Sequence, residues 1–231
     1  MDYKCIFIDL DDTLWDFHAN ARSSLQEIYE RRSLGQYFDS FEQYFTLYAK
    51  RNVELWEMYG KGNITKEVLT RERFLHPLIQ VGIDNAALAL EIGDEYLELL
   101  PTRNALVPYA RELLDYLYPK YQLTIISNGF VEVQYKKLHS CHIEQYFANV
   151  VLSEAAKALK PDKRIFEYAL RLNRAKATEA IMIGDSYEAD IAGAQNAGID
   201  QIYFNPRSGY SDKSGPATFQ VKSLKEIMDI L

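Results

Sequence analysis

The stretch that decides the fold is residues 5–13, which read Cys-Ile-Phe-Ile-Asp-Leu-Asp-Asp-Thr. Its first four residues form a continuous apolar run, which is typical of a strand buried on both faces. Asp9 and Asp11 follow at once. Because ligands of doubly wound sheets bind beyond the carboxyl ends of the strands, we expect both carboxylates to lie at one site.

Similar apolar runs recur along the chain, and segments of helical period separate them. Strands that alternate with helices indicate an α/β domain, a doubly wound, Rossmann-like parallel sheet covered on both faces. A polar loop over residues 205–216 and a final helix over residues 223–231 complete the prediction. The expected later strands are residues 122–126, 149–152, 180–183 and 201–204, and the expected helices between them are 131–139, 164–172 and 191–197.

The segment after the first strand breaks this rhythm, because it is helical by pattern throughout. Helix breaks are expected at residues 60–63 and at His76-Pro77, with Thr65 as a helix N-cap. We therefore predict a helical cap domain over residues 17–104, inserted into a core domain formed by residues 1–16 and 105–231. Its aromatic stripe is predicted to be helix-packing core: Tyr37, Phe38, Phe41, Tyr44, Phe45 and Tyr48.

Composition excludes several functions. The 231 residues are 48% hydrophobic and carry a net charge of −7, which argues against a nucleic-acid polymer as partner. An anionic small molecule stays compatible, because a bound cation can reverse the local potential. No signal peptide or membrane-spanning run is visible, so we expect a cytoplasmic protein without a membrane partner. Cys5 and Cys141 form no disulfide framework, and Cys5 is expected to be a buried, reduced thiol.

Two close carboxylates repel each other, which favours a bound metal or a raised pKa in one of them. Asp9 and Asp11 therefore suit a division of labour, in which one is an ionised nucleophile and the other gives and takes a proton. An Asp-x-Asp pair by itself is equally typical of a turn or a helix cap.

Two more motifs carry groups that suit a phosphoryl ligand. Ser127, Asn128 and Gly129 follow a predicted strand, where a hydroxyl, an amide and backbone N–H groups can grip phosphate. Lys160, before Pro161, can hold a carboxylate nucleophile and offset charge that develops on phosphate. Lys157, three residues earlier, is the alternative for this role.

A fourth motif, residues 184–190, carries Asp185 at a strand end and Asp190 about one helical turn later. Carboxylate oxygens are hard ligands that suit Mg²⁺, which usually takes one or two carboxylates besides water and substrate phosphate. A first-turn acid favoured by the helix dipole is the simpler explanation of Asp190 taken alone.

In this order, the four motifs resemble those of the haloacid dehalogenase superfamily: Asp-x-Asp-x-Thr, Ser/Thr-Asn, Lys-Pro and Gly-Asp-x₄-Asp. The resemblance implies that Asp9 attacks phosphorus and that Asp11 protonates the leaving oxygen and later activates water. It implies Mg²⁺ held by the Asp9 carboxylate, the Asp11 carbonyl and Asp185, with Asp190 supporting its waters. Ser127 and Lys160 would hold the phosphoryl group. Asp12 departs from the family, which usually carries Gly there.

A narrower resemblance is to the pyrimidine 5'-nucleotidase branch, and it implies a small phosphorylated metabolite, a nucleoside monophosphate, as substrate. A phosphatase of a sugar phosphate or of the phosphoglycolate type is the alternative. A 2-haloacid dehalogenase stays below these because Asp11 is present, and a catalytically retired binding protein because all the motif acids are intact. A phosphomutase is a further, less favoured alternative that one sequence does not exclude, and release of free phosphate without a bisphosphate activator would discriminate it. The resemblance rests on Leu55-Trp56, Tyr59, Gly62-x-Ile64-Thr65, Arg73-Phe74 and Asn128-Gly129-Phe130.

Overall fold

The computed structural model describes residues 2–206 and 216–231, and its chain forms two compact units. The first unit comprises Met1–Phe17 and Asn104–Leu231, and the second comprises His18–Arg103. Each unit is treated by itself below. Within the described residues, no helix combines the length and apolar character needed to cross a membrane.

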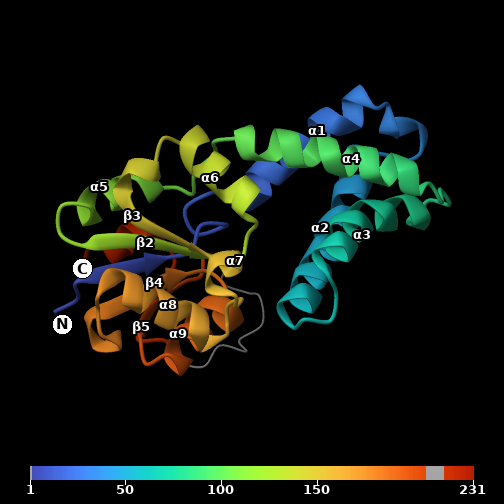
Figure 1. The fold of residues 1–231 in the computed structure, drawn as a ribbon. Coiled ribbons are helices and arrows are strands. Elements are labelled where there is room, and N and C mark those ends of the chain that lie inside the picture. Colours follow the sequence, from blue (N-terminus) through green and yellow to red (C-terminus); the bar gives the residue numbers. More distant parts are fainter. Residues whose placement is uncertain (1, 207–215) are drawn as a thin grey trace. The chain divides into compact units, whose positions relative to one another are not determined.

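A six-stranded, fully parallel sheet in the order β3-β2-β1-β4-β5-β6 forms the centre of the first unit (Figure 1). This architecture confirms the predicted α/β doubly wound fold. The sequence pattern had missed the short β6, which adds an edge strand. The strands are β1 (Cys5–Ile8), β2 (Gln122–Ser127), β3 (Phe147–Leu152), β4 (Ala180–Gly184), β5 (Asp200–Phe204) and β6 (Phe219–Val221).

The register of the central strands brings the motifs to one edge of the sheet. Ile8 of β1 pairs with Ile125 of β2 and with Ile183 of β4. The residues that follow these three positions therefore lie side by side. They include Asp9 after β1, Ser127 at the end of β2, and Gly184 and Asp185 at the end of β4. Parallel pairing thus assembles groups that lie more than a hundred residues apart in the chain.

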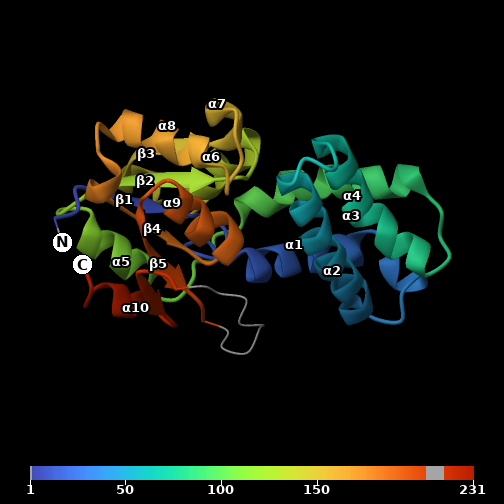
Figure 2. The same ribbon diagram turned by 90° about the horizontal axis from the view of Figure 1, so that it is seen from below.

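Helices cover both faces of this sheet, and Figure 2 shows α8 and α5 on opposite sides of it. Cys5 and Phe7 of β1 pack in one core cluster with Ile165, Phe166 and Ala169 of α8. All four residues of β1 are buried, as their unbroken apolar run predicted. The helices of this unit are α5 (Ala110–Leu117), α6 (Val131–Ser140), α7 (Ser153–Ala156), α8 (Lys163–Asn173), a π-helical turn (Tyr187–Ala192), α9 (Gly193–Asn196) and α10 (Leu224–Ile227).

The second unit is helical. The hydroxyl of Thr65 accepts a hydrogen bond from the Val68 N–H, so the predicted N-cap is confirmed. Tyr44 and Tyr48 lie in its core, where Tyr48 donates to the Tyr96 hydroxyl at 2.8 Å. Packing is thus the role of these stripe aromatics. The helices are α1 (Phe17–Arg31), which starts in the first unit, α2 (Phe41–Gly60), α3 (Lys66–Gln80) and α4 (Ala86–Leu99).

Two predicted helix limits were wrong. The expected break at His76-Pro77 is absent, because α3 continues through Pro77 to Gln80. Pro77 and Leu78 are buried, and we attribute the continuation to this packing, which offsets the local cost of about 3 kcal/mol for an internal proline. The final helix is also shorter than residues 223–231, since α10 ends at Ile227 and hydrogen-bonded turns follow. Most of the loop predicted over residues 205–216 lies outside the described residues.

Candidate active site at the carboxyl edge of the sheet

The backbone continues the sheet at Asp9 and then forms a tight turn at Asp12. The Asp9 N–H donates to the Ile183 carbonyl at 2.9 Å, which extends the sheet by one residue. Asp12 then adopts a left-handed conformation with φ 59°, and its N–H donates to the Trp15 carbonyl. Glycine suits such a position best, and Asp is among the few other residues that tolerate it. This explains how Asp12 can stand where the family usually has Gly.

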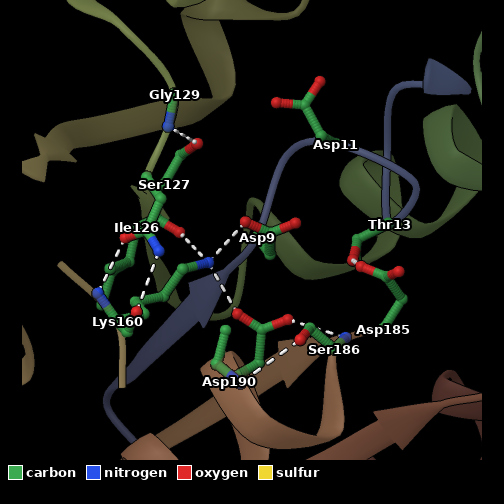
Figure 3. Close-up of polar contacts among 12 residues, drawn as sticks. Asp9, Asp11, Thr13, Ile126, Ser127, Gly129, Lys160, Asp185, Ser186 and Asp190 are labelled. Carbon is green, nitrogen blue, oxygen red and sulfur yellow. Dashed lines mark hydrogen bonds and ion pairs between the residues drawn. The ribbon is translucent and has the colours of Figure 1, made fainter. Parts of the chain in front are cut away.

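Lys160 lies at the centre of the site. Its ammonium donates to Asp9 Oδ1 at 2.5 Å, to Asp190 Oδ1 at 2.6 Å and to the Ile126 carbonyl at 2.8 Å (Figure 3). These three hydrogen bonds use all three ammonium protons. Only 3% of the side chain is exposed, so the ammonium is shielded from solvent. Lys157, the alternative considered from the sequence, is exposed. The structure thus brings Lys160 to the carboxylates.

Asn128 holds the backbone that carries this lysine. The Lys160 N–H donates to Asn128 Oδ1 at 2.7 Å, and Asn128 Nδ2 donates to the Lys160 carbonyl at 2.9 Å. The peptide bond between Lys160 and Pro161 is cis. The Asn128 amide therefore connects the end of β2 to the Lys-Pro segment, a contact that sequence reasoning did not anticipate.

Asp190 is fixed by groups on both of its oxygens. Oδ1 binds Lys160, and Oδ2 accepts from the Ser186 N–H at 3.0 Å. A Cβ added at Gly184 would lie 2.3 Å from Asp190 Oδ2. The glycine of the Gly-Asp motif therefore provides the space in which this carboxylate lies. Next to it, Asp185 Oδ1 accepts from the Thr13 hydroxyl at 3.1 Å.

The charges of this cluster are strongly coupled. Burial, together with Asp190 and Asp11, raises the pKa of Asp9 to about 7, although Lys160 opposes the change. Burial and the neighbouring acids Asp9 and Asp190 also raise the pKa of Asp185 well above its usual value. Burial alone would lower the pKa of Lys160, but Asp190 and Asp9 outweigh it and raise that pKa. Asp9, Asp185 and Asp190 together therefore carry more acid than the Lys160 ammonium neutralises.

The donor set fits a divalent cation. Asp9, Asp185 and Asp190 each offer a carboxylate oxygen, and these atoms lie within 4.8 Å of one another. Such hard oxygen donors suit Mg²⁺, and a dication would favour the ionised form of the acids. The Asp11 carboxylate is not a member of this group of three.

Asp11 has a separate environment, and its carboxylate turns away from Asp9 in Figure 3. Lys137 Nζ lies 2.6 Å from Asp11 Oδ1, and Gln134 Nε2 donates to Asp11 Oδ2 at 2.8 Å. Sequence reasoning missed both donors. The available signal was two polar residues at positions i and i+3 on the otherwise apolar face of a predicted helix.

Ser127 is linked to the same network. Its Oγ accepts from Gln134 Nε2 at 2.6 Å and from the Gly129 N–H at 3.1 Å. Because a hydroxyl oxygen has two lone pairs, these bonds leave its proton available for donation. The Gly129 N–H is already used within the loop.

A cavity of about 420 Å³ opens beside Asp185. Its size is within the usual range for small-molecule pockets. The wall comes from the first unit, and it includes Asp12, Asp16, Tyr203, Lys222 and Ser223.

Known proteins resemble this chain over its whole length. A family model for haloacid dehalogenase-like hydrolases matches residues 3–198. The HAD-hydrolase YfnB of Bacillus subtilis is 30% identical over 99% of this chain and 95% of its own. The orthorhombic crystal structure of YfnB, bound to magnesium, superposes with a TM-score of 0.89, at 28% identity, over 100% of this chain and 99% of its own.

Relatives with a stated activity include two pyrimidine 5'-nucleotidases. The pyrimidine 5'-nucleotidase PynA of Streptococcus pneumoniae is 29% identical over 100% of this chain and 96% of its own. The pyrimidine 5'-nucleotidase YjjG of Escherichia coli is 28% identical over 100% of this chain and 99% of its own.

Proposed function

Because this chain belongs to the haloacid dehalogenase-like hydrolase family, we propose that it is a Mg²⁺-dependent phosphomonoester hydrolase with Asp9 as covalent nucleophile. The observation that carries the proposal is the different surroundings of two neighbouring acids. Asp9 is buried against Lys160, whereas Asp11 is partly exposed and is bound by donors of α6. This separation suits one carboxylate that attacks and another that transfers protons.

In the first step, an Asp9 oxygen attacks phosphorus and the bond from phosphorus to the leaving oxygen breaks. Asp11, in the protonated form that this step requires, gives its proton to that oxygen. In the second step, Asp11 takes a proton from water as the water oxygen attacks the aspartyl-phosphate. The bond from phosphorus to Asp9 then breaks, which releases phosphate and restores both acids.

Ser127 would hold the transferred group through a hydrogen bond, whereas Lys160, whose three ammonium protons are already bonded within the protein, would act on it through its charge. The Lys160 ammonium, 2.5 Å from Asp9 Oδ1, keeps the nucleophile in place and offsets charge on the phosphoryl oxygens. The Ser127 hydroxyl can donate to a phosphoryl oxygen, since its two lone pairs are occupied. Asn128 acts on the substrate indirectly, through the backbone of Lys160.

Mg²⁺ would be held by the Asp9 carboxylate, the Asp11 carbonyl and Asp185. Asp190, whose two oxygens already bind Lys160 and the Ser186 N–H, would support the waters of the metal. When bound, the ion would offset the repulsion between the negatively charged nucleophile and the negatively charged phosphate.

As substrates we propose nucleoside monophosphates with a pyrimidine base, since PynA and YjjG resemble this chain over their whole lengths. Residues 17–104 would serve as the cap domain that receives the base. Of the aromatics quoted for this resemblance, Phe74 is buried in packing, whereas Trp56 and Tyr59 are partly exposed. Their rings are in edge contact at 5.7 Å.

The test is release of inorganic phosphate from a panel of phosphomonoesters, with Mg²⁺ or with excess chelator. We expect the highest kcat/KM with deoxyuridine and thymidine monophosphates, no turnover in chelator, and recovery on adding Mg²⁺. Asp185→Asn should raise the Mg²⁺ concentration needed for half-maximal rate, whereas the exposed Asp84→Asn should not.

Four outcomes would contradict parts of this proposal. Faster turnover of sugar phosphates would overturn the nucleotide assignment. Full activity in chelator would overturn the metal requirement. Halide release from a 2-haloacid, or phosphate transfer that needs a bisphosphate activator, would replace the hydrolase assignment with a dehalogenase or a phosphomutase.

A further inference from the structure

One face of α6 is bonded to Asp11. Lys137 and Gln134 lie three residues apart, so both side chains leave the helix on the same side. Lys137 Nζ reaches one oxygen of the Asp11 carboxylate and Gln134 Nε2 reaches the other, at 2.6 and 2.8 Å. The carboxylate is therefore held at both oxygens, which fixes its rotation as well as its position.

Lys137 is an unusual residue for this face of the helix. Its side chain is only 4% exposed, and its ammonium lies 4.3 Å from the centre of the Trp15 ring. A buried ammonium is costly unless a charged partner compensates it. Asp11, whose side chain is 29% exposed, is that partner. The ion pair thus anchors a carboxylate that is solvent-accessible at the edge of the sheet.

Gln134 connects the same carboxylate to Ser127. Its Nε2 donates to both Asp11 Oδ2 and Ser127 Oγ, and because both are acceptors, the amide is held in one orientation. A Cβ added at Gly129 would lie 2.3 Å from Gln134 Nε2. The glycine of the Ser-Asn-Gly motif therefore provides the space for this bridge.

The bridge has an energetic cost. Gln134 is fully buried, and its Oε1 has no hydrogen-bond partner among the residues that the structure describes. An unpartnered buried carbonyl costs about 1–3 kcal/mol. Stability alone would favour an apolar residue here, so the two contacts of Nε2 point to a role for Gln134 other than stability.

We propose that Lys137 and Gln134 are positioning residues that fix the Asp11 carboxylate for proton transfer and couple it to the phosphate-binding Ser127. This inference rests on the proposed role of Asp11. Lys137 acts through Asp11 and not on the substrate. Its loss therefore slows the step that needs a proton, and leaves substrate binding unchanged.

The experiment measures single-turnover release of the leaving group from two phosphomonoesters by the Mg²⁺-loaded enzyme. An alkyl phosphate needs a proton on its leaving oxygen, whereas p-nitrophenolate leaves without one. For Lys137→Met we expect the rate with the alkyl ester to fall roughly 10–100-fold, the range typical of residues that orient a metal ligand through a hydrogen bond. The rate with p-nitrophenyl phosphate should fall much less, and KM should stay constant for both esters. Lys137→Arg keeps a cation at this position and should therefore be less impaired than Lys137→Met.

Lys136→Met is the matched control, because Lys136 is the neighbouring lysine on α6 and is exposed. It should behave as the wild type with both esters. If Lys137→Met does not fold, Gln134→Met carries the test. That variant keeps the ion pair and removes the bridge, and it should show the same preference for the better leaving group.

A double-mutant cycle with Asp11→Asn separates the possible roles. If Lys137 acts through Asp11, Lys137→Met adds no loss to Asp11→Asn. Additive losses, or a raised inhibition constant for inorganic phosphate, would overturn the proposal, because Lys137 would then bind the phosphoryl group. Equal losses for both esters would overturn it as well. Failure of the proposed function would appear separately, as an Asp11→Asn enzyme with wild-type turnover of the alkyl ester.

Discussion

The Nζ atom of Lys160 lies 2.5 Å from Oδ1 of Asp9, and both side chains are almost completely buried. The same ammonium also binds Asp190. One cation thus serves two buried acids, which fixes the geometry of the site and leaves one of these two acids without a matching cation.

The first prediction concerns the nucleophile. Asp9→Asn keeps a side-chain oxygen for Lys160 but removes the attacking carboxylate, so phosphate release should fall by about 10⁴-fold or more. No phosphorylated protein should be trapped after acid quenching with labelled substrate. Asp84→Asn is the control. An Asp9→Asn enzyme that still forms a phosphoenzyme would exclude Asp9 as nucleophile.

The second prediction compares two lysines. Lys160→Met should lower kcat/KM by about 100-fold or more, because a preorganised cation beside the developing charge is lost. It should also lower the melting temperature, since two buried acids lose their partner. Lys157→Met removes an exposed ammonium and should change neither quantity. Equal effects of the two substitutions would contradict the central role of Lys160.

The third prediction concerns the close approach of Gly184 and Asp190. Gly184→Ala would place a methyl group 2.3 Å from Asp190 Oδ2, so the carboxylate must move. We expect a loss of about 1–3 kcal/mol in unfolding free energy, together with reduced turnover. Denaturant unfolding and phosphate release measure the two effects.

Gly60→Ala is the matched control for that variant. A Cβ at Gly60, at the end of α2, would meet nothing within 4 Å. This substitution should leave turnover unchanged and should not destabilise the protein. If Gly184→Ala also leaves both quantities unchanged, the proposed need for space at Gly184 is wrong.

The fourth prediction concerns a buried cation in the second unit. Nε and Nη2 of Arg73 are buried and have no hydrogen-bond partner within the described residues, although the guanidinium lies 5.0 Å from the Phe74 ring centre. The guanidinium also lies 5.2 Å from the Tyr96 ring centre. We expect the relieved desolvation to exceed the two lost cation–π contacts, so Arg73→Met should raise the unfolding free energy by about 1 kcal/mol. The exposed Arg71→Met on the same helix should have little effect. A lower melting temperature for Arg73→Met would refute this account.

The fifth prediction concerns the two thiols. Burial is the main cause that raises the pKa of Cys5 and of Cys141 to about 11. At pH 8 the folded protein should therefore react very slowly with a disulfide reagent, whereas both thiols should react at once in denaturant. The thiols ionise near pH 9 in the unfolded protein but only near pH 11 in the folded protein. Their ionisation therefore lowers the unfolding free energy as the pH rises from about 9 to 11. Fast reaction of the folded protein at pH 8 would show that a thiol is accessible.

The amino-acid sequence by itself determined the type of fold and the place of the acids. The segments before Asp9, Ser127 and Asp185 each form a strand, as their short, mostly apolar runs rich in β-branched residues predicted. Parallel strands end at one edge, so the side chains that follow them meet there. Local patterns sufficed for these predictions, since each depends on a few consecutive residues.

Tertiary structure decided which individual groups touch. Lys160 and Lys157 stand three residues apart, and the backbone held by Asn128 directs Lys160 to the acids. Lys137 meets Asp11 from 126 positions away, through the packing of α6. No local pattern encodes such a contact, because it depends on where a helix comes to rest against the sheet. For the same reason, packing overrode the proline signal at Pro77.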